Sequence, residues 1–270
     1  MNKPLFSNNR LTRRRLGGVP LRVPMRVIVP NVVTLLALCL GITAIRFAIE
    51  QQFTQAVLCI LGAAVFDGLD GRIARALKGT TRFGAELDSL ADFIDFGVAP
   101  AIVLYLWSLE STKSFGWFAV LVYAVACALR LARFNVTLDE EASTGPSSRF
   151  FTGMPAPAGA LVVLLPLYLH LSALALPNLP RLVPFQIAYV LVVAFLMVSR
   201  IPHFSGKTIG RIPREHVGAV MFAGAVAILL LFTFPMEMLI VLTLGYFALI
   251  PLSIRQARKL REAEDVGQIH

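Results

Sequence analysis

Residues 53–75 read FTQAVLCILGAAVFDGLDGRIAR, in which fourteen uncharged residues (53–66) are followed by two aspartates, Asp67 and Asp70. At about 1.5 Å per residue, this run covers roughly 21 Å of a bilayer core that is about 30 Å thick. The stretch therefore predicts a transmembrane helix that carries carboxylates inside the membrane, close to one face. Ionised side chains are costly at that depth and mark functional sites.

The rest of the chain has the composition of a membrane protein. Of 270 residues, 57% are hydrophobic and only 15% are charged, whereas a soluble domain is about one quarter charged. The apolar runs are continuous, so they predict helices rather than the alternating strands of a β-barrel. We expect an all-α polytopic bundle of about eight transmembrane helices, although hydropathy alone also allows six or seven. The expected spans are 31–50, 53–77, 84–108, 115–135, 156–176, 183–200, 217–234 and 236–254.

The formal charge of +9 follows the membrane topology and does not indicate a nucleic-acid partner. Basic residues gather in alternate connecting segments, and the other side keeps only Lys113, Arg181 and Arg46. The positive-inside rule then places both termini in the cytoplasm, with the chain in the cell (inner) membrane. We divide the chain into a basic cytoplasmic arm (1–29), a transmembrane catalytic domain (30–254) and a charged cytoplasmic tail (255–270).

A second pair of aspartates, Asp88 and Asp92, begins the third span. Asp67 and Asp70 are three residues apart and Asp88 and Asp92 are four apart, so each pair shares one helix face. A loop of about six residues makes the two helices an antiparallel hairpin. Counted from that loop, the two pairs lie at the same depth on the cytoplasmic side of the membrane, and the four carboxylates should converge.

Four carboxylates at close quarters need positive charge. Arg75 and Lys78 are candidates, but both lie nearer the loop. Divalent ions such as Mg²⁺ suit carboxylate oxygens and leave positions free for phosphate, and two ions can stabilise both the attacking and the leaving oxygen of a phosphoryl transfer. A proton relay or a pairing with arginine is the alternative for an isolated intramembrane aspartate. The spaced quartet favours the metal site and chemistry on a lipid phosphate.

The spacing of the quartet resembles a known signature. Eight residues over 26 positions match the motif of the CDP-alcohol phosphatidyltransferases: Asp67, Asp70, Gly71, Ala74, Arg75, Gly84, Asp88 and Asp92. The resemblance implies a CDP-linked lipid donor, a hydroxyl acceptor, CMP as leaving group and two divalent cations, Mg²⁺ or Mn²⁺. It also implies a six-helix core, which the eight-span prediction extends by two helices, and a homodimer.

The same resemblance assigns roles residue by residue. Asp67, Asp70 and Asp88 correspond to metal ligands, and Asp92 to a ligand that is also the catalytic general base. Donor binding falls to a face made by five residues: Asp67, Gly71, Ala74, Arg75 and Gly84.

Segments outside the signature resemble the membrane-integral phosphatidylserine synthases and imply L-serine as the acceptor; they are 87–100, 129–135 and 151–157. Asp95 departs from this pattern, which has a small polar residue there. It could bind the ammonium of the acceptor, pair with a basic residue or indicate another acceptor. Arg130 and Arg133, with Asn135, could hold the donor phosphates or the serine carboxylate, or simply mark the membrane boundary.

Three other functions compete with this interpretation. A sister enzyme would use glycerol 3-phosphate, inositol phosphate or choline. An intramembrane prenyltransferase also binds diphosphate through aspartates, but with different spacing and no role for Gly84. An ion-coupled transporter would favour broken helices or inverted repeats, and the sequence contains no such repeat.

Overall fold

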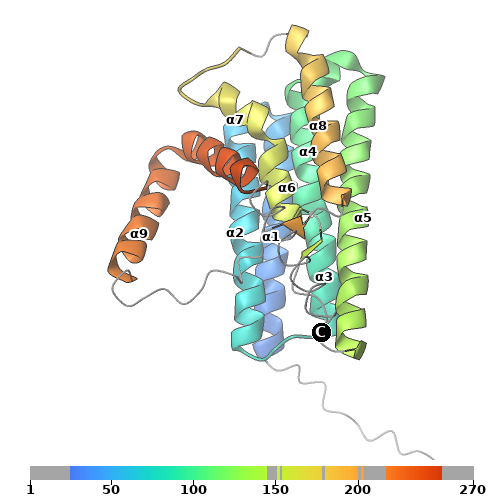
Figure 1. Cartoon of the computed structure of the whole chain (residues 1–270), viewed down its shortest axis with the longest axis vertical. Coiled ribbons are helices and arrows are strands. Elements are labelled where there is room, and N and C mark those ends of the chain that lie inside the picture. Colours follow the sequence, from blue (N-terminus) through green and yellow to red (C-terminus); the bar gives the residue numbers. More distant parts are fainter. Residues whose placement is uncertain are drawn as a thin grey trace, which may run out of the picture.

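The computed structural model describes residues 25–144, 151–152, 154–177, 180–199, 202–203 and 217–250. Most of the predicted N-terminal arm and the whole predicted tail (255–270) lie outside this range. The described part is a bundle of helices with their long axes roughly parallel (Figure 1). Its only strands are two-residue segments, β1 (Phe151–Thr152) and β2 (Pro202–His203), which pair antiparallel. The chain is therefore helical, as the apolar runs predicted.

The first two helices are α1 (Met25–Ile49) and α2 (Phe53–Ala76). The second of them, α2, is the first helix of the predicted hairpin, and α1 is its neighbour. They pack along their length (Figure 1). Pro30 lies inside α1 and has no N–H to donate to the carbonyl of Arg26. That carbonyl meets the α2–α3 loop, where a Cβ on Gly79 would lie 2.0 Å from its oxygen. The loop thus closes against the beginning of α1 because residue 79 is glycine.

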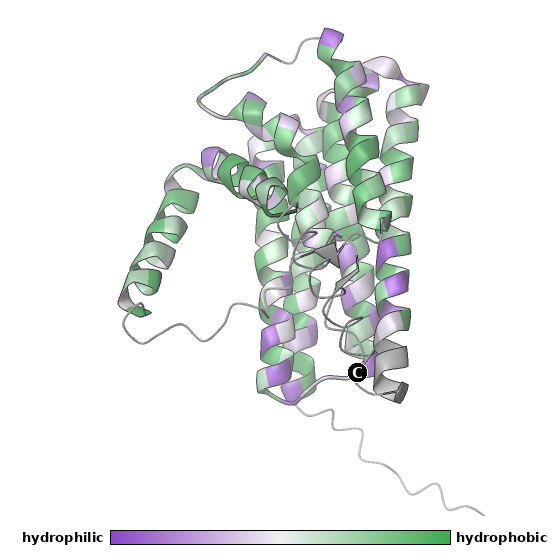
Figure 2. Cartoon of the chain, in the orientation of Figure 1, coloured by the Kyte–Doolittle hydropathy of each residue, from purple (hydrophilic) through white to green (hydrophobic). Residues whose placement is uncertain are grey.

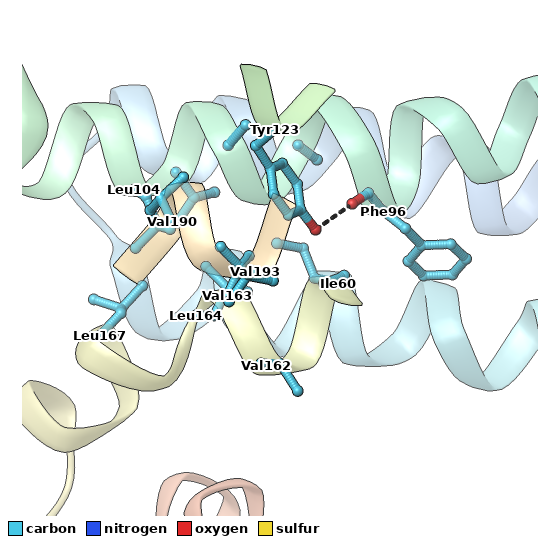
Figure 3. Close-up of a cluster of buried hydrophobic side chains, with 14 of the residues drawn as sticks. Ile60, Phe96, Leu104, Tyr123, Val162, Val163, Leu164, Leu167, Val190 and Val193 are labelled. Carbon is cyan, nitrogen blue, oxygen red and sulfur yellow. Dashed lines mark hydrogen bonds between the residues drawn. The ribbon is translucent and has the colours of Figure 1, made fainter. Parts of the chain in front are cut away.

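The third predicted span is a single run of helix in three parts: α3 (Arg82–Asp92), a π-helical turn η1 (Phe93–Val98) and α4 (Ala99–Trp107). Pro100 follows the π-helical turn and cannot donate to the carbonyl of Phe96. The hydroxyl of Tyr123 donates to that carbonyl instead, at 2.9 Å (Figure 3). The turn contains Asp95, and π-helical turns are common at functional sites.

The long helix α5 (Ser114–Thr144) extends nine residues beyond the predicted end at 135, so much of the loop expected at 136–155 is helical. The fifth predicted span is divided into α6 (Ala156–Val163) and α7 (Leu165–Leu171), because Pro166 cannot donate to the carbonyl of Val162. The hydroxyl of Tyr189 donates to that carbonyl at 2.6 Å. At both prolines, Pro100 and Pro166, a tyrosine hydroxyl therefore donates a hydrogen bond to the carbonyl four residues before the proline.

Three further α-helices follow: α8 (Val183–Val198), α9 (Val217–Thr233) and Pro235–Ile250. Two short 3-10 helices, η2 (Leu109–Thr112) and η3 (Pro180–Leu182), precede α5 and α8. None of the residues of α9 is buried, and this helix stands away from the bundle (Figure 1). The helix Pro235–Ile250 buries one face, with Leu239 fully enclosed and Thr243 3% exposed. It lies across the bundle beside α6 and α7 (Figure 1).

Three helices of the described part are long and apolar enough to cross a membrane: Met25–Ile49, Arg82–Trp107 and Ser114–Thr137. Three shorter ones are also apolar: Val183–Val198, Val217–Thr233 and Pro235–Ile250. The second predicted span, α2, is in neither group, and its last ten residues carry four charged side chains. The structure supports a helical membrane protein, while the number of eight spans stays a prediction.

The core is made almost entirely of apolar side chains from α2, α4, α5, α6 and α8. Ile60, Tyr123, Val163 and Val193 are all fully buried there (Figure 3). The charged residues lie elsewhere: Figure 2 shows hydrophilic residues gathered toward one end of α2 and α5, with apolar residues over the middle. This packed core holds the helix ends that carry the aspartates.

Candidate active site

Three carboxylates meet between α2 and α3. One oxygen each from Asp67, Asp70 and Asp88 lies within 4.8 Å of the others. The two helices run antiparallel from a short loop, and each helix turn repeats its side-chain direction after three or four residues. The hairpin therefore brings aspartates that are up to 21 residues apart in the sequence to one point.

Asp92 belongs to the same group, one helical turn farther from the loop than Asp88. Its side chain interacts directly with Asp67 and electrostatically with Asp88. Asp67 and Asp92 thus form the deeper level of the group, and Asp70 and Asp88 the level nearer the loop. This is the arrangement that the helix spacing predicted.

Asp70 is fastened to the neighbouring helix α1. The hydroxyl of Thr34 donates to Asp70 Oδ2 at 2.6 Å, and both residues are buried, at 5% and 4% exposed. A hydrogen bond of this length is typical of a hydroxyl that donates to an ionised carboxylate. Reasoning from the sequence gave Thr34 no role, because nothing in the sequence places α1 against Asp70.

Arg130 reaches the carboxylates from α5. Its guanidinium interacts electrostatically with Asp92 and Asp67 and lies 5.6 Å from the centre of the Phe134 ring. Tyr246, from the helix Pro235–Ile250, is within electrostatic range of the same guanidinium. The last described helix therefore comes near Arg130, although the sequence indicated no role for residues beyond about 215.

The other two polar residues predicted with Arg130 are bonded elsewhere. Arg133 donates from Nη1 to the carbonyl of Val198 at 2.8 Å, at the end of α8. Asn135 donates from Nδ2 to the hydroxyl of Ser89 at 2.9 Å. Arg133 thus ties α5 to α8, and Asn135 ties α5 to α3 beside Asp88.

The small residues of the signature allow close approach. A Cβ on Gly84 would lie 2.9 Å from Asn31 Oδ1, so glycine there lets α1 approach the beginning of α3. A Cβ on Gly71 would lie 3.6 Å from Arg75 Nη1, which places that guanidinium along the same face of α2. Ala74 is half-buried on α2, and Arg75 is exposed.

Asp95 is a fifth carboxylate, deeper still. It lies in the π-helical turn, is 1% exposed, and interacts electrostatically with Asp67. Its Oδ1 has no hydrogen-bond partner among the described residues. A Cβ on Gly41 of α1 would lie only 2.0 Å from this oxygen, so the carboxylate occupies space that only a glycine at position 41 leaves open.

The donor set suits hard divalent cations. Mg²⁺ and Mn²⁺ prefer carboxylate oxygens, and three such oxygens already lie together. Lysine and arginine do not neutralise them through ion pairs, because the only salt bridge in the described part joins Arg46 and Glu50. Mutual repulsion in a poorly solvated place makes this group unfavourable without a cation.

A separate cavity of about 330 Å³ lies at the other end of the bundle. Its lining includes Trp107, His170, Gln186 and Tyr189. These residues come from the ends of α4, α7 and α8 that are remote from the carboxylates (Figure 1). The cavity is therefore not part of the candidate active site.

A helical bundle with clustered carboxylates inside its spanning helices is typical of an integral membrane enzyme that handles phosphates. Comparison with known families agrees with this class and narrows it. Residues 27–198 match the CDP-alcohol phosphatidyltransferase family. The chain belongs to that family.

Individual relatives extend the similarity beyond the family region. The CDP-diacylglycerol–serine O-phosphatidyltransferase of Mycobacterium leprae is 43% identical over 241 residues, which covers 86% of this chain and 76% of the relative. The protein of the same name from Mycobacterium bovis is 38% identical over 241 residues, or 88% of this chain and 82% of the relative. That of Bacillus subtilis is 33% identical over 179 residues, or 65% of this chain and 90% of the relative.

Proposed function

We propose that this chain transfers the phosphatidyl group of CDP-diacylglycerol to the hydroxyl of L-serine, which yields phosphatidylserine and CMP. The family match and the names of the relatives support this reaction. The observation that carries the chemistry is the meeting of Asp67, Asp70 and Asp88 within 4.8 Å. These three carboxylates concentrate negative charge at the place where the diphosphate of the donor, with its cations, would bind.

In this proposal Asp67, Asp70, Asp88 and Asp92 hold two divalent cations, Mg²⁺ or Mn²⁺. When bound, such ions balance the charge of the diphosphate and of the departing CMP. The carboxylates themselves are fixed on two packed helices, so little reorganisation is needed when the donor binds. This supports a site that is formed before the substrate arrives.

Asp92 is the proposed general base. It accepts the proton of the serine hydroxyl as that oxygen forms a bond to the phosphatidyl phosphorus, and the bond between phosphorus and the CMP oxygen breaks. A base must lie within hydrogen-bond reach of the proton that it takes. Asp92 is half-buried, at the deeper level of the group, where a hydroxyl could approach it beside the donor phosphate.

Donor and acceptor contacts are assigned to the surrounding side chains. Gly71, Ala74, Arg75 and Gly84, together with Asp67, form the proposed donor face of the α2–α3 hairpin. Arg130 is the proposed partner for a phosphate or for the serine carboxylate, since it already faces Asp92. Arg133 and Asn135 would have to leave Val198 and Ser89 to join it, so we propose that they act by holding helices in place. Asp95 remains the proposed partner for the acceptor's ammonium.

We further propose eight membrane spans, both termini and the active site on the cytoplasmic side of the cell (inner) membrane, and a homodimer. The distribution of basic residues supports the orientation. The exposed apolar surface of α9 is consistent with contact with lipid or a second subunit.

The reaction is tested by supplying purified protein with CDP-diacylglycerol and Mg²⁺ or Mn²⁺, then measuring CMP release. L-Serine, glycerol 3-phosphate, inositol phosphate, inositol and choline are added in separate reactions. We expect release with serine and little with the others. CMP release with another acceptor and none with serine would change only the acceptor in the proposal. No CMP release with any of them would contradict the proposed transferase activity.

A further inference from the structure

Among the residues that the structure describes, Thr34 makes the hydrogen bond that links α1 to the carboxylate group. Its hydroxyl lies 2.6 Å from Asp70 Oδ2 and 3.2 Å from the carbonyl of Pro30 in its own helix. A hydroxyl has a single proton to donate. The shorter distance and the negative charge of the carboxylate both favour donation to Asp70, because charge-assisted bonds are shorter and stronger.

Such a bond restricts the carboxylate. An aspartate with no partner turns freely about its last torsion, which is broad and roughly two-fold. A buried donor on a neighbouring helix removes that freedom, and Thr34 itself is stiff because it is branched at Cβ. Outer-shell donors of this kind orient metal ligands, and their loss typically lowers metal affinity or activity about 10- to 100-fold.

We propose that Thr34 is a positioning residue of the metal site: its hydroxyl orients the Asp70 carboxylate toward Asp67 and Asp88, so that α1 contributes to binding the divalent cation. The inference rests on the proposed function, since it assumes that Asp70 is a ligand. It adds to the eight-residue signature a position 33 residues before its first member.

A structural role is the competing explanation, because Thr34 also packs between α1 and α2. Two substitutions separate the roles. Thr34→Val keeps the branched shape and removes the donor, whereas Thr34→Ser keeps the donor and removes a methyl group. Thr43 offers a matched control on the same helix, since its hydroxyl donates to the carbonyl of Cys39 at 2.6 Å and to no aspartate.

The test measures Mn²⁺ binding to the purified full-length protein by electron paramagnetic resonance, without donor or acceptor. We expect Thr34→Val to weaken Mn²⁺ binding about 10-fold or more. Thr34→Ser should retain most of the affinity, and Thr43→Val should match the unmodified protein. Equal affinity in Thr34→Val and the unmodified protein would overturn the inference. Equal losses in Thr34→Ser and Thr34→Val would also overturn it, because packing would then explain both.

Further variants keep the result interpretable. If Thr34→Val does not fold, Thr34→Ala removes the same donor without a branched side chain and is measured in its place. Asp70→Asn identifies the binding that depends on the site. If the unmodified protein binds no Mn²⁺ in an Asp70-dependent way, the metal function itself fails together with the inference. If it does bind, and loss of the Thr34 hydroxyl has no effect, only the inference fails.

Discussion

At the scale of single residues, the candidate site depends on what each carboxylate touches. Asp70 is bonded to Thr34, Asp92 faces Asp67 and Arg130, and Asp95 is enclosed against Gly41. Residues of one chemical type thus occupy three different surroundings. The proposed division into ligands, base and acceptor contact comes from the family resemblance, and these surroundings are what each role has to fit, because a carboxylate can accept a proton in the reaction only where a hydroxyl can reach it.

The base assignment predicts the effect of one substitution. Asp92→Asn keeps the size of the side chain and removes its ability to take a proton, so we expect CMP release to fall at least about 10²-fold. Glu110→Gln is the matched control, because Glu110 is exposed at the other end of the bundle. Initial rates with saturating serine measure both. A rate for Asp92→Asn within a few-fold of the unmodified enzyme would remove Asp92 as the base.

The contact between Gly41 and Asp95 predicts a stability effect. In Gly41→Ala the new methyl would lie 2.0 Å from Asp95 Oδ1, so α1 or the π-helical turn must shift. We expect a loss of about 1–3 kcal/mol, as for other overpacked sites. Thermal unfolding in detergent measures it.

Gly224→Ala is the control for that substitution. Nothing lies within 4 Å of the corresponding methyl in α9, and alanine is the better helix former by about 1 kcal/mol. Gly224→Ala should therefore keep or raise the unfolding temperature. Equal unfolding temperatures for Gly41→Ala and Gly224→Ala would contradict the close contact.

At the scale of helices, the same type of hydrogen bond occurs beside two of the prolines in the bundle. Pro100 and Pro166 cannot donate an N–H to the carbonyls of Phe96 and Val162, which lie four residues earlier. Tyr123 and Tyr189 donate their hydroxyls to these two carbonyls. The two bonds join the π-helical turn η1 to α5 and α6 to α8, so interruptions in single helices become links between helices. Hydropathy could locate the helices, but it could not predict that the fifth span would divide at Pro166.

The elements around the site differ in how well sequence periodicity describes them. The α2–α3 hairpin follows from helix spacing and a short loop, and the structure has it as predicted. The contributions of α1 and of the helix Pro235–Ile250 could not be predicted, because Thr34 and Tyr246 belong to apolar runs with no charged pattern. Arg130 and Arg133 look equivalent in the sequence, yet one faces the carboxylates and the other Val198.

At the scale of the whole molecule, the proposed orientation is open to a direct test. Lys78 and Lys113 are exposed and lie in loops at opposite ends of the bundle. With the native residues Cys39, Cys59 and Cys127 replaced, a membrane-impermeant maleimide should label Lys113→Cys in intact cells. It should label Lys78→Cys only after the membrane is opened, because the positive-inside rule places that loop in the cytoplasm. The reverse pattern would invert the topology.

The sequence alone determined the class of this protein and its helical architecture, and it predicted the four aspartates of the candidate site. These depend on local facts: apolar runs that must lie in lipid, and a helical period that places residues three or four apart on one face. Only the tertiary structure decided which neighbours those aspartates have. Thr34 and Arg130 reach them from α1 and α5, Gly41 lies against Asp95, and Tyr246 interacts with Arg130. Their approach depends on how the helices pack, which no pattern within a single helix contains.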